Sequence, residues 1–227
     1  MQKRRNLYSD RVHHLDDFAE ENALGPIQRD EALFLMGIVR TIRPKTIVEF
    51  GFSRGHSALN FLQALDGNGE LYSYDISNAS ADCAAKKFSK KKNFHFVKKS
   101  QEQFSPTDIR GRLIDFVFFD GSHVNITGQI TFKAILPSLA ENAIVAVHDT
   151  GVWQREHFLP DHDQFQKRYP EGWLNGQEFQ HRKEEREFVN WIAENYPEFQ
   201  LIHFHSSNCI RHGITLMQRQ RILATKP

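Results

Sequence analysis

At 227 residues, the chain has the length of one α/β domain with a substantial core. Hydrophobic residues make up 40% of the chain and charged residues 25%, which is typical of a soluble globular protein. The formal net charge of +1 gives no general attraction to nucleic acid or to an anionic membrane. We therefore expect neither nucleic acid nor a membrane among the partners.

The two cysteines, Cys83 and Cys209, stand far apart and form no Cys-x-x-Cys motif. A disulfide framework and a zinc–thiolate site are therefore not expected. The N-terminal stretch is charged and lacks the apolar core of a signal peptide, and no apolar run approaches membrane-spanning length. These features predict a cytoplasmic protein, with a polar arm over residues 1–25 and a single domain over residues 26–227.

The domain is expected to open with a helix from Pro26 to near Pro44, because an apolar stripe at helical spacing lies between these prolines. The next stretch, Thr46–Ser57, organises the rest of the chain. It begins as an apolar strand, turns at Gly51 and Gly55, and continues at helical spacing. Strand, glycine turn and helix start a doubly wound α/β unit, whose helix N-terminus offers free N–H groups to a ligand.

The glycine spacing indicates which ligand this turn receives. Gly51-x-x-x-Gly55, with Ser53 between the glycines, departs from the Gly-x-Gly-x-x-Gly pattern of dinucleotide-binding turns. Glu49 stands two residues before the first glycine, where its carboxylate would repel a pyrophosphate but suit a cationic ligand. The alternative from this stretch alone is an ordinary strand-to-helix turn of another α/β protein.

A second candidate is Asp75, which ends the short strand predicted from Glu70. It follows Gly51 by 75 − 51 = 24 residues, close to the offset at which cofactor-binding α/β folds place a ribose-binding acid. A carboxylate at this point can accept hydrogen bonds from two neighbouring ribose hydroxyls. The alternative is an aspartate that caps the following helix.

The rest of the chain continues the alternation of strands and helices. Two buried strands end in polar residues, and a pair of strands closes the chain. The predicted strands are Phe94–Val97, Leu113–Phe119, Ala143–Val147, Phe199–Phe204 and Gly213–Met217. The predicted helices are Ala81–Lys92, Asn125–Leu139 and Gln177–Asn195. In the second of these helices, the residues expected to face inward are Ile130, Phe132, Ile135 and Leu136.

Four motifs in order resemble the class I S-adenosylmethionine-dependent methyltransferases, and in particular their small-molecule O-methyltransferase branch of catechol-type and macrocin-type enzymes. The motifs are Glu-x-Gly-x-x-x-Gly-x-Ser from Glu49, the strand-ending Asp75, Phe-Phe-Asp-Gly-Ser-His ending at His123, and Val-His-Asp-Thr ending at Thr150. The resemblance implies a Rossmann-like, mostly parallel seven-stranded sheet of order 3-2-1-4-5-7-6 with an antiparallel C-terminal hairpin.

The same resemblance implies S-adenosylmethionine as cofactor and a hydroxylated small molecule as methyl acceptor. The residues that it assigns to the cofactor are Glu49, Gly51, Phe52, Ser53, Gly55, Ser57, Asp75, Ser100, Gln101 and Asp120.

It also implies that His123 is the general base, with Asp120 beside it, and that Asp120 and Asp149 bind Mg²⁺. Two residues depart from the family patterns: His148 replaces an acid of the macrocin-type pattern, and Thr150 replaces an amide of the catechol-type pattern. Both changes reduce the set of hard oxygen ligands. The alternative is that the two aspartates cap the following segments and His123 packs beneath the loop.

Residues 151–176 lack clear periodicity and contain five aromatic residues. A long segment at the carboxyl edge of a sheet is often a lid or an acceptor-binding loop, so we expect a lid-like insertion here. Its aromatic side chains could equally pack on a substrate, anchor the loop or form the interface of a homo-oligomer.

Two further functions compete with methyl transfer. A nicotinamide-dependent oxidoreductase is disfavoured by Ser53 at the middle glycine position and by the closing hairpin. A non-catalytic, repurposed nucleotide-binding protein stays open, because a fold does not determine a function.

Overall fold

The computed structural model describes residues 27, 29–150, 184–205 and 213–220. The expected polar arm at residues 1–25 and the expected lid-like insertion at residues 151–176 lie outside these ranges, as does Cys209. None of the described helices is long and apolar enough to cross a membrane.

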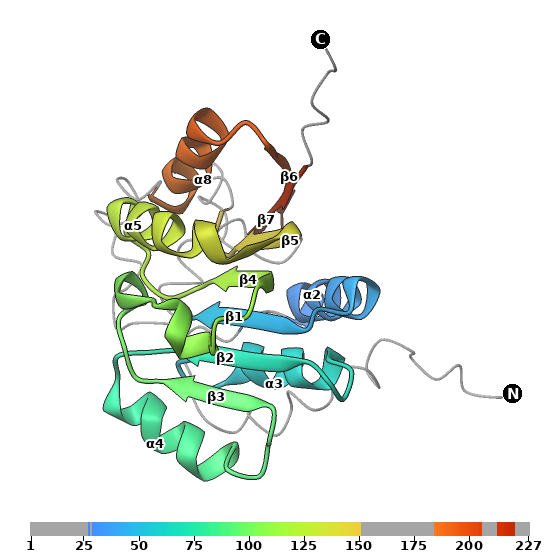
Figure 1. Ribbon diagram of the computed structural model, residues 1–227, viewed down its shortest axis with the longest axis vertical. Helices are drawn as coiled ribbons and strands as arrows, with labels where there is room; N and C mark the ends of the chain where they lie inside the picture. Colours follow the sequence, from blue (N-terminus) through green and yellow to red (C-terminus); the bar gives the residue numbers. More distant parts are fainter. Residues whose placement is uncertain (1–26, 28, 151–183, 206–212, 221–227) are drawn as a thin grey trace, which may run out of the picture.

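A seven-stranded sheet of order β3-β2-β1-β4-β5-β7-β6 forms the centre of the molecule (Figure 1). The first five strands in sequence are parallel, whereas β7 runs antiparallel to both β5 and β6. The strands are β1 (Thr46–Phe50), β2 (Glu70–Tyr74), β3 (Phe94–Val97), β4 (Ile114–Phe119), β5 (Leu139–Val147), β6 (Phe199–His205) and β7 (Gly213–Arg219). The predicted fold, including strand order and closing hairpin, is confirmed.

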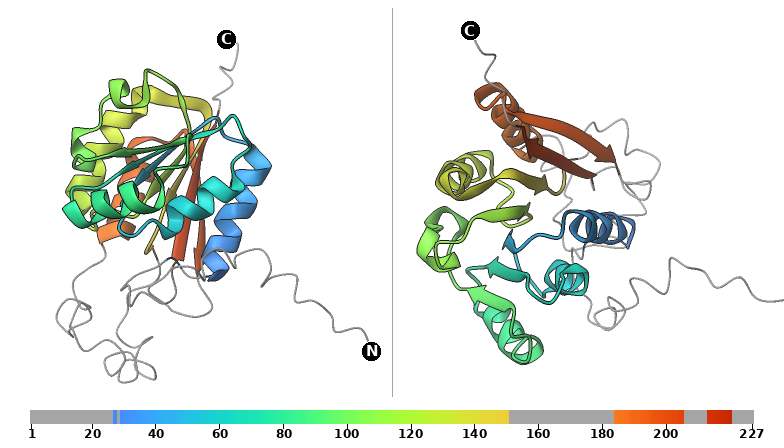
Figure 2. Two further views of the ribbon diagram at one scale, coloured as in Figure 1. Left: turned by 90° about the horizontal axis from the view of Figure 1, so that it is seen from below. Right: turned by 45° about the vertical axis from the view of Figure 1, so that its right-hand side comes forward.

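Helices cover both faces of this sheet (Figure 1, Figure 2). The described α-helices are α2 (Arg29–Ile42), α3 (His56–Ala64), α4 (Asn78–Lys87), α5 (Asn125–Ile135) and α8 (Glu184–Asn195). One core cluster joins buried residues of α2, α3 and α4 to one face, and a second joins α5 and α8 to the other. Side chains alternate between these clusters along β4, so that Phe116 and Phe118 enter the first and Val117 and Phe119 the second. Burial on both faces explains the continuous apolar run of this strand.

Two helix predictions need correction. The helix expected over Ala81–Lys92 is α4, which starts three residues earlier, where Ser77 caps its N-terminus, and ends at Lys87. The helix expected over Asn125–Leu139 is α5, which ends at Ile135 before a short 3-10 turn.

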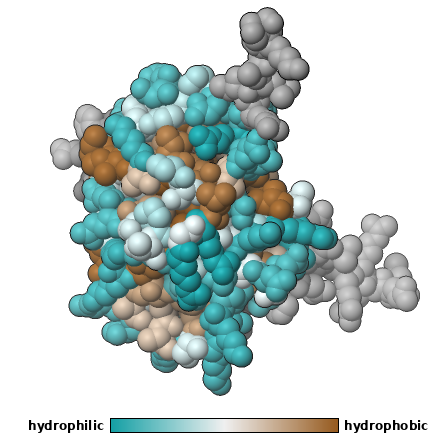
Figure 3. Space-filling view, in the orientation of Figure 1, coloured by the Kyte–Doolittle hydropathy of each residue, from teal (hydrophilic) through white to brown (hydrophobic). Residues whose placement is uncertain are grey.

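The expectation that Ile130 faces inward is wrong, since 44% of this side chain is exposed. The buried positions of α5 are Gly128, Thr131, Phe132 and Ile135, and Ile130 lies on the other side of the helix. Together with the exposed Ile126, it adds apolar surface to this helix. Figure 3 shows a mostly hydrophilic face with separate hydrophobic patches, one of them over α5.

Candidate active site

The glycine turn after β1 is held tightly between the ends of β2 and β4. The backbone N–H groups of Gly51 and Phe52 both donate to the carbonyl of Tyr74, at 2.9 and 3.2 Å. Gly51 has φ +101°, and a Cβ built on it would lie 2.1 Å from the carbonyl oxygen of Asp120. Only glycine fits here, because any side chain would clash with this carbonyl and strain the backbone. The turn therefore brings the main chain of β1 directly against Asp120.

Phe52 and Ser57, which were both predicted to serve the cofactor, point into the protein. The Phe52 side chain is 1% exposed and packs against Phe88 and Phe96, with ring centroids 5.3 Å apart in each pair. Ser57, at the start of α3, donates its hydroxyl to the carboxyl group of Glu49. Both side chains support the turn from the interior of the protein, and their contact with a cofactor stays a prediction.

Glu49 is completely buried beneath the turn. Its two carboxyl oxygens accept hydrogen bonds from the hydroxyls of Ser57 and Ser73. Burial raises the pKa of Glu49 to about 8, although the two hydroxyls act in the opposite direction. This raised pKa favours the protonated form, and the observed role of Glu49 is to organise the turn, while its contact with the cofactor stays a prediction.

Asp75 follows β2 and holds the glycine turn from the other side. Its Oδ2 accepts a hydrogen bond from the backbone N–H of Ser53 at 2.8 Å, and its Oδ1 accepts one from Ser77 at 2.8 Å. The N-cap of α4 is Ser77, whose side chain accepts from Ala79 and Ser80. The capping alternative for Asp75 is therefore wrong, and the carboxylate lies beside the turn.

Ser100 and Gln101 lie in the loop after β3. The buried Gln101 accepts a hydrogen bond from the backbone N–H of Ser122 at 2.8 Å and donates one to Thr131 at 3.1 Å. Ser100 donates to Glu102 at 2.8 Å. Gln101 thus connects the loops that follow β3 and β4, and the predicted adenine contact of both residues stays a prediction.

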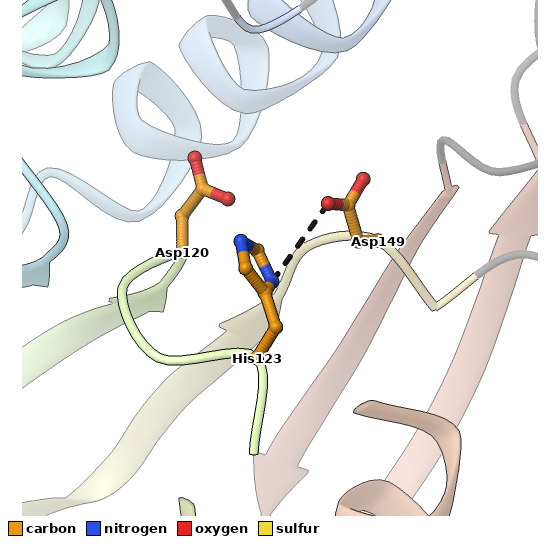
Figure 4. A group of neighbouring side chains, drawn as sticks. All are labelled: Asp120, His123 and Asp149. Carbon is orange, nitrogen blue, oxygen red and sulfur yellow. Dashed lines mark ion pairs between the residues drawn. The ribbon is translucent and has the colours of Figure 1, made fainter. Parts of the chain in front are cut away.

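Asp120, His123 and Asp149 come together at the carboxyl ends of β4 and β5. Each offers one ligand atom, and these atoms all lie within 4.8 Å of one another. Figure 4 shows the imidazole ring of His123 between the two carboxylates. Asp149 has φ +56°, a left-handed conformation that aspartate and asparagine tolerate better than most residues. The structure therefore brings together the three residues that the sequence assigned to base and metal.

Two glutamates that sequence reasoning missed complete this cluster. Glu185 of α8 lies 2.8 Å from Nδ1 of His123, whereas Asp149 lies 3.8 Å from the same atom. Burial lowers the pKa of His123, but the hydrogen bond with Glu185 and the charges of Asp149 and Asp120 outweigh this effect and raise it.

Glu31 of α2 is the other missed residue, and its partner is the buried His148. The Nε2 atom of His148 lies 3.0 Å from Glu31 and its Nδ1 atom 3.0 Å from Asp120. Burial lowers the pKa of His148, but the charges of Asp120 and Asp149 and the hydrogen bonds with Asp120 and Glu31 raise it well above its ordinary value. His148, the residue that replaces a family acid, thus lies between two carboxylates that favour its protonated form.

A small pocket, with room for about one water molecule, adjoins this cluster on the side of α5 and α8. Its lining combines charged groups with an apolar wall. The lining residues are Phe119, Asp120, Ser122, His123, Val124, Gly128, Val147, His148, Glu184, Glu185 and Phe188.

A family model described as "Methyltransferase domain" matches residues 48–150. No curated protein matches the sequence. Among solved structures, the fold is similar to an O-methyltransferase from Bacillus cereus in complex with SAH, with 16% identity, 93% of this chain and 90% of the other covered, and a TM-score of 0.61.

It is also similar to the O-methyltransferase TomG from Streptomyces achromogenes in complex with SAM, with 17% identity, 96% and 92% coverage, and a TM-score of 0.59. A third similar structure is an SAH-bound methyltransferase from Podospora anserina, with 16% identity, 93% and 88% coverage, and a TM-score of 0.65.

At these identities the solved structures establish the fold, and the match over residues 48–150 contains the glycine turn, Asp75, His123 and Asp149. Residues 48–150 therefore match a methyltransferase domain, the fold is that of the class I methyltransferases, and the predicted resemblance to that class is confirmed.

Proposed function

We propose that this protein transfers the methyl group of S-adenosylmethionine to a hydroxyl oxygen of a small molecule. One observation carries the proposal. The carbonyl of Asp120 lies against the Gly51 turn, while the carboxylate of Asp120 belongs to the cluster with His123 and His148. A cofactor on the turn and an acceptor beside His123 would then meet at one residue, which is the proximity that transfer between two ligands requires.

The residues around the turn fit S-adenosylmethionine. Gly51 and Gly55 form the tight turn between β1 and α3, and the carboxylate of Asp75 beside it could accept hydrogen bonds from ribose hydroxyls. The carboxylates of Asp120, Asp149, Glu31 and Glu185 outnumber the imidazoles of His123 and His148 at the neighbouring strand ends. This excess of negative charge favours a cationic ligand. When bound, S-adenosylmethionine supplies a methyl group already activated by its positive sulfur.

His123 removes the acceptor's proton in this proposal. A new O–C bond forms as the C–S bond breaks, the electrons of the broken bond stay on sulfur, and the hydroxyl proton passes to the imidazole. The carboxylates of Asp149 and Glu185 stabilise the imidazolium that results. The raised pKa of His123 makes its neutral imidazole a stronger base for this proton.

A divalent ion at Asp120 and Asp149 is part of the same proposal. The donor set fits, because ligand oxygens of Asp120 and Asp149 lie within 4.8 Å of one another and carboxylates are ligands that Mg²⁺ prefers. The ion would hold the acceptor oxygen and lower its pKa.

We expect Asp149→Asn to weaken Mg²⁺ binding by at least about tenfold, because an amide replaces one of the two charged ligands. Asparagine accepts the left-handed backbone at this position, so the fold should be kept. Isothermal titration of both proteins with MgCl₂ measures the effect, and Asp115→Asn, whose carboxylate binds the backbone of Lys45 and Thr46, is the control. Equal affinities in all three proteins would remove the ion from the proposal.

Asp75→Ala tests the cofactor itself. Loss of a charged acceptor for the ribose hydroxyls is expected to cost on the order of 2 kcal/mol in affinity for S-adenosylhomocysteine. Calorimetric titration with S-adenosylhomocysteine and, in parallel, with NAD measures this and separates methyl transfer from the oxidoreductase alternative. Asp66→Ala, on the turn before β2, serves as control because its exposed carboxylate pairs only distantly with Arg43, at 3.8 Å. Unchanged affinity in Asp75→Ala, or tighter binding of NAD, would contradict the proposal.

A further inference from the structure

The carboxylate of Glu185 is buried beside His123, and its position there needs an explanation. The side chain is 8% exposed, and its Oε1 atom lies 2.8 Å from Nδ1 of His123. Burying a carboxylate is costly unless it is paired and hydrogen-bonded, so this contact is needed to hold the charge in place. The other carboxylate near Nδ1, that of Asp149, lies 3.8 Å away and also 3.4 Å from His148. Glu185 is therefore the hydrogen-bond partner of His123, and Asp149 is a neighbouring charge.

The position of Glu185 is determined by how α8 packs on α5. A Cβ built on Gly128 of α5 would lie 2.9 Å from the Phe188 ring, so the absence of a side chain allows the two helices to approach closely. Glu184 adds a polar contact, because its carboxylate accepts a hydrogen bond at 2.7 Å from the backbone N–H of Asn125 at the start of α5. These contacts hold the first turn of α8 against the loop that carries His123.

We propose that Glu185 is the positioning residue of His123. Its carboxylate accepts a hydrogen bond from Nδ1–H of His123, so that Nε2 presents its lone pair to the methyl acceptor. The inference rests on the proposed methyl transfer and adds to it a residue outside the stretch of the chain that matches the methyltransferase domain. The hydrogen bond at one ring nitrogen decides which nitrogen of a neutral imidazole carries the proton.

The orientation of the ring agrees with this assignment. In Figure 4 the nitrogen joined to Asp149 by the dashed line is Nδ1, and the other nitrogen, Nε2, points to the side of Asp120. Asp120 is also the residue that touches the cofactor turn through its carbonyl. A base whose lone pair points to this side is aimed at the place where the acceptor and the methyl group would meet.

The test is a measurement of the His123 tautomer. In protein labelled with ¹⁵N-histidine, proton–nitrogen correlation spectra near pH 9 distinguish Nδ1–H from Nε2–H rings, and His123→Gln identifies the signals of this residue. We expect His123 in the wild type to be the Nδ1–H form. Glu185→Ala should shift His123 toward the Nε2–H form. Glu185→Gln should retain the Nδ1–H form, because its amide oxygen can still accept the hydrogen bond. Glu187→Ala removes an exposed acid from the same turn of α8 and should change nothing.

An Nε2–H ring in the wild type, or an unchanged tautomer in Glu185→Ala, would overturn the inference. With a methyl acceptor in hand, Glu185→Ala should lower kcat by at least about tenfold with the KM for S-adenosylmethionine little changed, and Glu185→Gln should recover part of the loss. Equal loss in both variants would mean a role of charge alone and would also overturn it. A tautomer shift in a protein that transfers no methyl group would support the positioning contact while refuting the proposed function.

Discussion

His123→Ala is expected to lower the turnover of methyl transfer by about 10²- to 10⁴-fold, the range that general bases contribute. The variant keeps the glycine turn and Asp75, so its affinity for S-adenosylhomocysteine should change little. The raised pKa of His123 adds a pH signature, because the base must be neutral to accept a proton. The activity of the wild type should therefore rise with pH above the ordinary histidine range, and the variant should lose this rise.

The matched control is His95→Ala. His95 also pairs with a glutamate, since its Nε2 atom lies 3.2 Å from Glu70, but it belongs to β3 and takes no part in the cluster at the ends of β4 and β5. Turnover per folded molecule should be close to the wild-type value in this variant. Full turnover in His123→Ala, measured with a methyl acceptor and saturating S-adenosylmethionine, would rule out His123 as the base.

Glu49→Gln is expected to remove a large pH dependence of stability. The pKa of Glu49 is about 8 in the folded protein and ordinarily 4.5, so the folded state keeps a proton that the unfolded chain loses. The stabilising contribution is complete below about pH 4.5 and is lost as pH rises toward about 8. A difference of one pH unit between the folded and unfolded pKa corresponds to about 1.4 kcal/mol, so the loss across this window is on the order of 5 kcal/mol.

Urea unfolding of the wild type and of Glu49→Gln at several pH values between 5 and 8 measures this effect. As pH rises, the free energy of unfolding of the wild type should fall relative to that of Glu49→Gln, because a glutamine has no proton to lose. Glu102→Gln changes an exposed glutamate and should follow the wild type at every pH. Parallel curves for Glu49→Gln and the wild type would show that Glu49 is already ionised in the folded state.

The strands and most helices could be predicted from the sequence because their signals are local, whereas the strand order followed from the family resemblance. Apolar runs such as that of β4 indicate strands buried on both faces. Gly51 and Gly55 indicate a tight turn, because a side chain at either position would clash with neighbouring atoms. Helix ends were less predictable. α4 starts after the N-cap Ser77, whereas the prediction followed the lysine-rich stretch downstream and so placed the helix too late in the chain. Ile130 stands two residues from Phe132, so helical spacing places it on the opposite face of α5, and the inward prediction followed its apolar side chain alone.

The site could be predicted only in part, for a similar reason. Asp120, His123 and Asp149 follow strands, and adjacent parallel strands bring their carboxyl ends together, so chain order alone predicts their proximity. Glu31 and Glu185 stand on helices, and the former is 117 residues from its partner His148. A glutamate on a helix ordinarily faces solvent, so the residue type gives no sign of burial. Helical spacing does give one, because Glu185 shares a face with Phe188 and Ile192, and Glu31 shares a face with Leu35. The raised pKa of Glu49 likewise depends on burial by tertiary packing.

The hydrogen-bond chain from Glu31 through His148 to Asp120 bears on where a minimal catalytic fragment could begin. The family match starts at Val48, inside β1, and so leaves out the whole of α2. A fragment cut at that point would retain every motif residue yet leave His148 with a carboxylate at one ring nitrogen only. His148 would then lose one of the contacts that raise its pKa, and Asp120 would lose a firmly oriented partner. The helix before the first strand thus supports the proposed active site through His148, and a truncated version should start ahead of Arg29.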